Sequence, residues 1–155
     1  MHNCLISGCC CYNHAEFIRN SYDCFLYCEP MPRTLELSTL RHTWIFDLDG
    51  TLVEHNGYKN GRDYLLPGVK VFFSSIPEED FIIILTAREK SSEEATKRFL
   101  AENGIRYNAI FFEIPMGERI LVNDNKPSGL VCAFALTPVR NQGLEDFNLI
   151  INESL

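Results

Sequence analysis

A run of five apolar residues at positions 81–85, with the sequence FIIIL, limits the fold more than any other segment. Continuous runs of this kind, rich in β-branched residues, are typical of a parallel strand that is buried on both faces. A shorter apolar run, WIF, precedes it at residues 44–46. Between the two runs, Pro67 can open a helix through residue 76, because proline is favoured at the first helical position. The order strand, helix, strand predicts a parallel βαβ unit.

The rest of the chain continues this alternation. A second helix is predicted at residues 91–102, and three further strands at residues 109–112, 119–122 and 131–136. The last residues, 143–155, are interpreted as a final short helix. We therefore expect an α/β domain with a doubly wound, Rossmann-like arrangement, in which helices flank a central parallel sheet. Ligands of such folds bind at the carboxyl ends of the strands.

The first part of the chain differs in composition from the rest. Residues 1–42 show no regular hydrophobic period, so the predicted domain covers residues 43–155, and we expect the cysteine-rich extension before it to be poorly ordered. The adjacent cysteines lack the paired spacing of structural zinc sites, although zinc binding stays a lesser alternative. The extension could also be translated sequence upstream of a start at Met31. Six of the seven cysteines lie in it: Cys4, Cys9, Cys10, Cys11, Cys24 and Cys28.

Charge and hydropathy narrow the class of protein. The chain has 155 residues, a net charge of −7 and a pI near 5.1, which argues against broad electrostatic binding of nucleic acid or of an anionic membrane surface. No apolar run approaches the roughly 20 residues that cross a bilayer. The chain lacks the basic segment followed by an apolar stretch that marks an export signal, so we predict none. We expect a cytoplasmic protein with a small soluble substrate, in which disulfides are disfavoured.

The first strand leads into two acidic residues, in the sequence FDLDGTL at residues 46–52. Alternation along a strand sends side chains i and i+2 to the same side, so Asp47 and Asp49 can face one site. Two carboxylates this close repel each other. A hard divalent cation such as Mg²⁺ relieves the repulsion and can bridge to a phosphate. The pair therefore indicates a site for a metal ion and a phosphate group.

These residues resemble the first motif of the haloacid-dehalogenase superfamily, DxDGT followed by a hydrophobic residue, and the match over residues 47–52 is complete. The resemblance implies that Asp47 attacks a phosphoryl group to form an aspartyl-phosphate. It also implies that Asp49 is the general acid and base, and that Thr51 belongs to the phosphate site. True dehalogenases lack the second aspartate, so the resemblance favours phosphate-ester chemistry.

Two later segments resemble further motifs of the superfamily. Thr86 follows the strand at residues 81–85, where the resemblance implies a hydroxyl that hydrogen-bonds the transferring phosphoryl group. Arg88 would contact the substrate anion or would lie at the surface. Asp124, in the sequence LVNDNKP at residues 121–127, is the implied ligand of Mg²⁺, together with Asp47 and the backbone carbonyl of Asp49. Family members more often have two acids here, whereas this chain has Asn123 in place of one of them. The asparagine keeps an oxygen ligand but removes a charge, which should weaken metal binding somewhat without abolishing it.

The third motif departs from the superfamily pattern. Relatives with a similar layout place lysine before a proline, whereas this chain has Ile114 before Pro115. An isoleucine cannot stabilise negative charge, and the phosphoryl site still needs a cation. Lys126, two residues after Asp124, is the first candidate to replace the lysine, and Arg119 is the second. The alternative is that Lys126 is only a solvated loop residue.

The spacing of the motifs leaves no room for a cap domain. Residues 53–66 fit the small β-hairpin flap that follows the first motif in relatives. An open site implies a large substrate, or closure by an oligomer partner or by the N-terminal extension. We expect a Mg²⁺-dependent phosphatase acting on a phosphomonoester, such as a sugar phosphate or another small metabolite. The alternatives are a catalytically weak domain that binds a phosphorylated ligand or a partner protein, and a polynucleotide-end phosphatase, which would need a basic groove.

Overall fold

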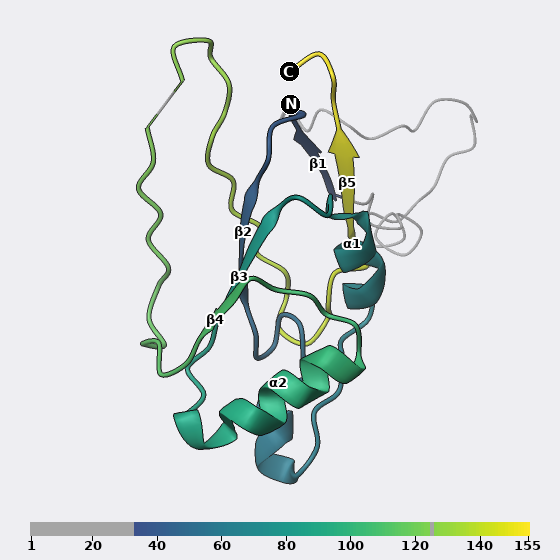
Figure 1. The fold of residues 1–155 in the computed structure, drawn as a ribbon, viewed down its shortest axis with the longest axis vertical. Coiled ribbons are helices and arrows are strands. Elements are labelled where there is room, and N and C mark those ends of the chain that lie inside the picture. The colour runs from purple at the N-terminus through teal and green to yellow at the C-terminus, as the bar shows by residue number, and fades with distance from the viewer. Residues whose placement is uncertain (1–32, 125) are drawn as a thin grey trace, which may run out of the picture. The chain divides into compact units, whose positions relative to one another are not determined.

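The computed structural model describes residues 33–124 and 126–155, which belong to one compact unit, Met31–Leu155. Strands and helices alternate between residues 43 and 111 (Figure 1). The expectations for the cysteines before residue 29 fall outside the described residues. Within those residues, no helix has the length and apolar character needed to cross a membrane. The elements are β1 (Arg33–Leu37), β2 (Thr43–Asp47), η2 (Gly57–Asn60), α1 (Val69–Ser75), β3 (Phe81–Leu85), η3 (Lys90–Ser92), α2 (Glu93–Glu102), β4 (Ala109–Phe111) and β5 (Phe147–Ile151).

Two parallel sheets organise the fold. The first has the strand order β2-β3-β4, and its register pairs Asp47 with Leu85 and Leu85 with Phe111. The second joins β1 to β5, with Arg33 opposite Phe147. The prediction of an α/β fold with parallel strands is confirmed for β2, β3 and β4. Their register brings the carboxyl ends of the three strands to one edge of the sheet, where ligand sites of parallel sheets form.

Helix α1 covers one face of the first sheet through aromatic side chains. Trp44 and Phe46 project from β2 and are stacked, with ring centroids 5.9 Å apart. Phe72 and Phe73 of α1 pack against them, and the Phe46 and Phe73 rings are 4.8 Å apart. Aromatic pairs contribute about 1 kcal/mol each beyond the area that they bury. This cluster fixes β2, and therefore the residues that follow it.

The strand predicted to be buried on both faces is buried on one. Ile82 and Ile84 of β3 are fully buried, whereas Phe81 is 44% exposed and Ile83 and Leu85 are half-buried. Ile45 of the neighbouring β2 is exposed in the same alternating manner. The prediction was wrong on this point. A run of apolar residues indicates a preference for strand backbone, whereas burial of the second face of the sheet depends on which segments pack against it.

Two predicted strands and one predicted helix do not form. Residues 119–122 and 131–136 contain no strand, and their apolar side chains are largely exposed, with Val122 at 89%. An extended segment becomes a strand only when it finds a hydrogen-bonding partner, and these segments pair with neither of the two sheets (Figure 1). The final helix predicted at residues 143–155 is also wrong. Strand β5 lies there instead, because its alternating Phe147 and Leu149 pack toward the core beside β1.

Strand β1 belongs to the compact unit, although the sequence placed its residues in the extension. Leu35 and Leu37 are both 7% exposed and lie in the same buried cluster as Phe147 of β5. The parallel pairing with β5, more than 100 positions away along the chain, supplies the partner that residues 33–37 lack locally. The ordered domain therefore begins before residue 43.

Candidate functional site

The site begins where β2 ends at Asp47 and the chain turns sharply. The amides of Leu52 and Val53 both donate to the carbonyl oxygen of Leu48, at 2.9 and 3.1 Å, and the amide of Gly50 donates to the carbonyl of Val53 at 2.7 Å. Gly50 has a φ of 91°, a left-handed conformation that glycine adopts without steric cost. This turn presents the two aspartates at the carboxyl edge of the sheet.

Asp47 is half-exposed and has one hydroxyl and one cation beside it. The Thr51 hydroxyl donates to Oδ2 of Asp47 over 3.2 Å, and an Nη2 of Arg119 lies 3.8 Å from its Oδ1. Partial burial raises the pKa of Asp47 above its ordinary value of 3.8, with the nearby charge of Asp49 acting in the same direction. The Thr51 hydroxyl and the Arg119 charge act in the opposite direction but do not cancel the effect. The carboxyl thus faces solvent and remains accessible.

Asp49 is held more firmly than Asp47. Its Oδ1 accepts a hydrogen bond from Nη2 of Arg88 at 2.8 Å, and its Oδ2 accepts from Nε of Arg88 at 2.9 Å. The Thr86 hydroxyl is 3.2 Å from Oδ2 of Asp49 and accepts from the amide of Arg88 at 3.1 Å. A bidentate guanidinium fixes both the position and the plane of a carboxylate. The orientation of Asp49 is therefore determined by β3 and the residues after it.

Arg88 is the most enclosed charged side chain of the site, only 2% exposed. Its Nη1 and Nη2 also donate to both oxygens of Asp63, at 2.8 and 2.7 Å, and Nη1 donates to the Thr96 hydroxyl at 2.9 Å. The guanidinium lies 4.2 Å from the centre of the Tyr58 ring. Burial alone would lower the pKa of Arg88, but the hydrogen bonds to Asp63 and Asp49 raise it above its ordinary value. The surface position considered for Arg88 is excluded, and its contacts are with protein groups.

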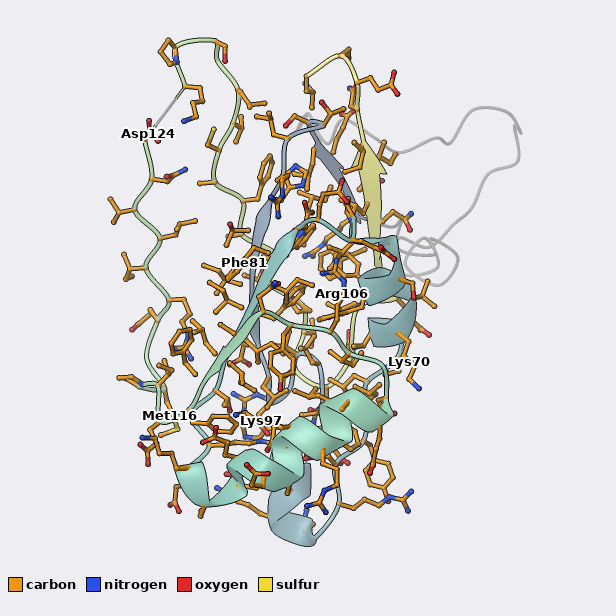
Figure 2. The ribbon with its side chains drawn as sticks, viewed as in Figure 1. Lys70, Phe81, Lys97, Arg106, Met116 and Asp124 are labelled. Carbon is orange, nitrogen blue, oxygen red and sulfur yellow. The ribbon has the colours of Figure 1, made fainter. Side chains whose placement is uncertain are left out.

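Asp124 and Lys126 do not join the two aspartates in this structure. The side chain of Asp124 is 72% exposed, and its charged neighbour is Lys126, 3.9 Å away. Figure 2 shows Met116 and Asp124 at opposite ends of an extended segment. Asp124 lies at the end nearer to Phe81, the residue that begins β3. Parallel pairing puts Phe81 at the amino edge of the sheet, opposite the edge where Asp47 lies. The segment that would carry Asp124 to the site is the one whose predicted strand is not formed.

The described residues therefore supply an incomplete set of ligands for Mg²⁺. Asp47 offers accessible carboxylate oxygens, whereas both oxygens of Asp49 are engaged by Arg88. Among the residues that the structure describes, no three acidic, histidine or cysteine side chains come together around a common point. Mg²⁺ ordinarily takes six oxygen ligands, several of them water, with one or two carboxylates from the protein. One accessible carboxylate does not by itself make such a site.

Three side chains of the site were not identified from the sequence. Asp63 and Thr96 bind Arg88, and neither has a motif of its own. Asn141 crosses over the turn: its amide donates to the carbonyl of Gly50 at 2.9 Å, and its Oδ1 accepts from the amide of His55 at 2.8 Å. Asn141 has a φ of 66°, a conformation in which asparagine is enriched. The contacts of Asp63 and Asn141 join residues that are 25 or more positions apart in the sequence, so the local sequence pattern could not reveal them. Thr96 is only eight positions from Arg88.

The residues predicted to form a flap, 53–66, form a loop whose two ends are joined. Val53 and Leu65 form an antiparallel bridge, and the amide of Glu54 donates to the carbonyl of Tyr64 at 2.9 Å. Between these ends the chain forms the single 3₁₀ turn η2 rather than two hairpin strands. We call residues 53–66 the flap loop.

Comparisons of the chain with protein-family models, with curated proteins and with solved structures found no match. The function is therefore argued from the arrangement at the carboxyl edge of β2 and β3. Two carboxylates, two threonine hydroxyls and the cation of Arg119 converge there, and a second, buried cation fixes one of the carboxylates.

Proposed function

We propose that this protein is a phosphohydrolase of the haloacid-dehalogenase type, which cleaves a phosphomonoester through an aspartyl-phosphate on Asp47. The observation that carries the proposal is the difference between the two aspartates. Asp47 is accessible and weakly held, as a nucleophile must be, whereas Asp49 is fixed beside it by Arg88 and Thr86. The sequence DxDGT at residues 47–51, at the end of a parallel strand, supports the same assignment.

The proposed reaction has two displacements. A carboxylate oxygen of Asp47 attacks phosphorus, and the bond from phosphorus to the ester oxygen breaks. Asp49, protonated at Oδ2 while Arg88 donates to its Oδ1, gives its proton to the departing alcohol. In the second displacement Asp49 takes a proton from water, the water oxygen attacks phosphorus, and the bond to Asp47 breaks. The products are the alcohol and inorganic phosphate, and both aspartates return to their starting states.

Arg119 is the proposed cation for the developing phosphoryl charge, in the role that sequence alone gave first to Lys126. Its guanidinium is 3.8 Å from Asp47, while Lys126 lies beside the exposed Asp124. A positive group that is already in place when charge develops lowers the barrier without reorganisation. The side chain of Arg140 also approaches the turn, because its Cγ would be 3.0 Å from a Cβ built on Gly50.

The substrate class follows from access and charge. The nucleophile is exposed, and the net charge of −7 disfavours a polyanionic substrate such as a nucleic-acid end. We propose a sugar phosphate or a comparable small phosphate ester. Mg²⁺ remains the proposed cofactor from the family resemblance, but the ligand set found here is incomplete, and the steps above are written for the chain's own residues.

The experiment that tests the proposal is a phosphate-release assay on a panel of phosphomonoesters, run with added Mg²⁺ and with EDTA. We expect Mg²⁺-stimulated hydrolysis of at least one ester and its loss in Asp47→Asn. The matched control is Asp146→Asn, which makes the same chemical change at an exposed position outside the site. Activity that survives in Asp47→Asn would refute the assignment of the nucleophile.

A second candidate function is a domain that binds a phosphorylated ligand with little or no turnover. The observation that favours it is the engagement of both Asp49 oxygens by Arg88, which leaves neither oxygen free of a protein partner. The two candidates separate in one measurement. A pure binding domain would bind a phosphate ester equally well in the wild-type protein and in Asp49→Asn, and would release no phosphate in either.

A further inference from the structure

One buried cation connects the site to the flap loop, and its surroundings are the basis of a further inference. Arg88 follows β3 and is the largest side chain that is almost completely buried in the described residues. It forms bidentate pairs with Asp49 on one side and with Asp63 on the other. Asp63 belongs to the flap loop, and so does Tyr58, whose ring lies 4.2 Å from the guanidinium. The flap loop and the turn after β2 thus have a common anchor.

We propose that Arg88 is a positioning residue, which fixes the carboxylate of Asp49 and holds the flap loop closed through Asp63 and Tyr58. This inference rests on the proposed function, since it assigns Asp49 its orientation for proton transfer. It goes further in giving the loop a mechanical link to the reacting groups, and in giving roles to two residues that no motif marks.

The geometry makes this coupling strong. The side chains of Arg88 and Asp63 are 1% and 8% exposed, so solvent screens their interaction weakly. A buried guanidinium needs its hydrogen bonds, and here four of them go to carboxylates of two different segments and one to the Thr96 hydroxyl of α2. Asp49 alone cannot occupy all five N–H donors of the guanidinium fork. Removing the carboxylate of Asp63 therefore leaves two N–H donors of Arg88 without that partner, and it removes one of the contacts that tie the flap loop to Arg88.

The principal variants are Asp63→Asn and Arg88→Lys. Asp63→Asn keeps the shape of the side chain and removes its charge. Arg88→Lys keeps a positive charge but cannot bind two carboxylates with a planar fork. The matched control is Glu93→Gln, which removes a carboxylate from the surface pair with Lys97 on α2 and touches neither the flap loop nor Asp49. Urea unfolding of each variant reports whether the fold as a whole is intact.

The first measurement needs no activity. Trypsin can cut after Lys59, an exposed residue of η2 inside the flap loop. We expect Asp63→Asn to raise the rate of this cleavage by about 10-fold or more, because opening of the loop no longer breaks a charged pair. Glu93→Gln should leave the rate unchanged. Cleavage after Lys59 at the wild-type rate in Asp63→Asn would overturn the inference, whatever the protein hydrolyses.

The second measurement uses the substrate found in the phosphate-release screen. We expect Asp63→Asn to lower kcat by about 10-fold with KM changed less than about 3-fold, because the fixed geometry matters in the transition state. Arg88→Lys should lower kcat further, and the double variant should be no slower than Arg88→Lys alone, since both changes act through one contact. Additive losses, or a rise in KM alone, would overturn the positioning role. Absence of hydrolysis by the wild-type protein would instead refute the proposed function and leave the trypsin result to decide the loop contact.

Discussion

At the scale of single residues, two aspartates separated by one position have different surroundings. Asp47 has a threonine hydroxyl and a more distant arginine beside it, and partial burial raises its pKa. Asp49 shares a buried arginine with Asp63. Differences of this kind between neighbouring carboxyl groups are how a site assigns separate roles to chemically identical side chains.

Asp47→Asn should abolish activity and raise stability. Loss of the proposed nucleophile is expected to lower kcat by about 10⁴-fold or more. The raised pKa means that the folded state disfavours the charged form, so the stability cost grows as pH rises through the folded-state pKa and is present in full at neutral pH. The neutral amide removes this cost. The check is the urea midpoint at pH 7, where a lower midpoint in Asp47→Asn than in the wild type would contradict the argument.

Asp80 should make stability sensitive to acid. Burial by itself would raise the pKa of Asp80, but hydrogen bonds from the His42 amide at 2.8 Å, the Trp44 indole at 2.9 Å and the His42 ring at 3.0 Å lower it below 3.8. A lowered carboxyl pKa contributes stability above the unfolded-state value, and this contribution is lost as pH falls through the folded-state pKa.

We therefore expect Asp80→Asn to cost about 2 kcal/mol at pH 7, the scale of hydrogen bonds to a charged acceptor. The difference from the wild type should shrink as the pH is lowered past 3.8. Urea unfolding at a series of pH values measures it. Glu78→Gln, at an exposed position two residues earlier, is the control and should follow the wild type. A difference independent of pH would show that the charge of Asp80 is not involved.

Sequence reasoning named the two aspartates and some of their partners, but not the residues that hold Arg88. Asp47, Asp49, Thr51 and Thr86 could be named because they belong to two short segments that end adjacent parallel strands. Arg88 was named, yet its burial could not be foreseen, since it depends on Asp63, 25 positions away. The choice between Lys126 and Arg119 likewise depends on where a long unpaired segment runs.

At the scale of elements, the central alternation of strand and helix was predictable, and the segments without partners were not. Strands β2, β3 and β4 follow from apolar runs that pair with their neighbours in sequence order. Residues 119–122 have the same local character, but they find no such partner. A local preference for extended backbone is necessary for a strand but is not sufficient, because the ladder of hydrogen bonds needs a second segment to pair with.

A close crossing holds the start of α1 against the loop before β5, and it depends on Gly143. Gly143 has a φ of 78°, and a Cβ there would overlap the carbonyl oxygen of Pro67, which accepts the amide of Leu144 at 2.9 Å. We expect Gly143→Ala to destabilise the fold by about 3 kcal/mol or more, from overpacking added to backbone strain.

Gly104 provides the control for that substitution. It has a φ of 71°, close to that of Gly143, but a Cβ there would meet no atom within 4 Å. Gly104→Ala should therefore cost only the conformational strain of about 1 kcal/mol. Urea unfolding of both variants separates crowding from strain, and equal losses would mean that the contact with Pro67 relaxes without cost.

At the scale of the whole unit, the fold is completed by a strand pair that no local pattern connects. Strand β1 and strand β5 lie at the two ends of the described residues, yet they pair in parallel over five residues each (Figure 1). Sequence analysis placed the boundary of the domain after β1 and read β5 as a helix, because each strand acquires its partner only through the complete fold. Contacts between segments that are far apart in the sequence are the hardest part of a fold to predict from local sequence patterns.

A pair of truncated proteins tests whether β1 is part of the domain. A chain that begins at Met31 keeps β1, and one that begins at Thr43 removes Leu35 and Leu37 from the core and leaves an edge of β5 without its ladder. Burying a leucine contributes about 1.5–3 kcal/mol, so the shorter chain should lose about 3–6 kcal/mol relative to the longer one. Domains of this size have only about 5–15 kcal/mol in total, and the shorter chain should therefore be close to unfolding. The comparison is made by urea unfolding at equal protein concentration, and equal midpoints would mean that β5 and the core are stable without β1.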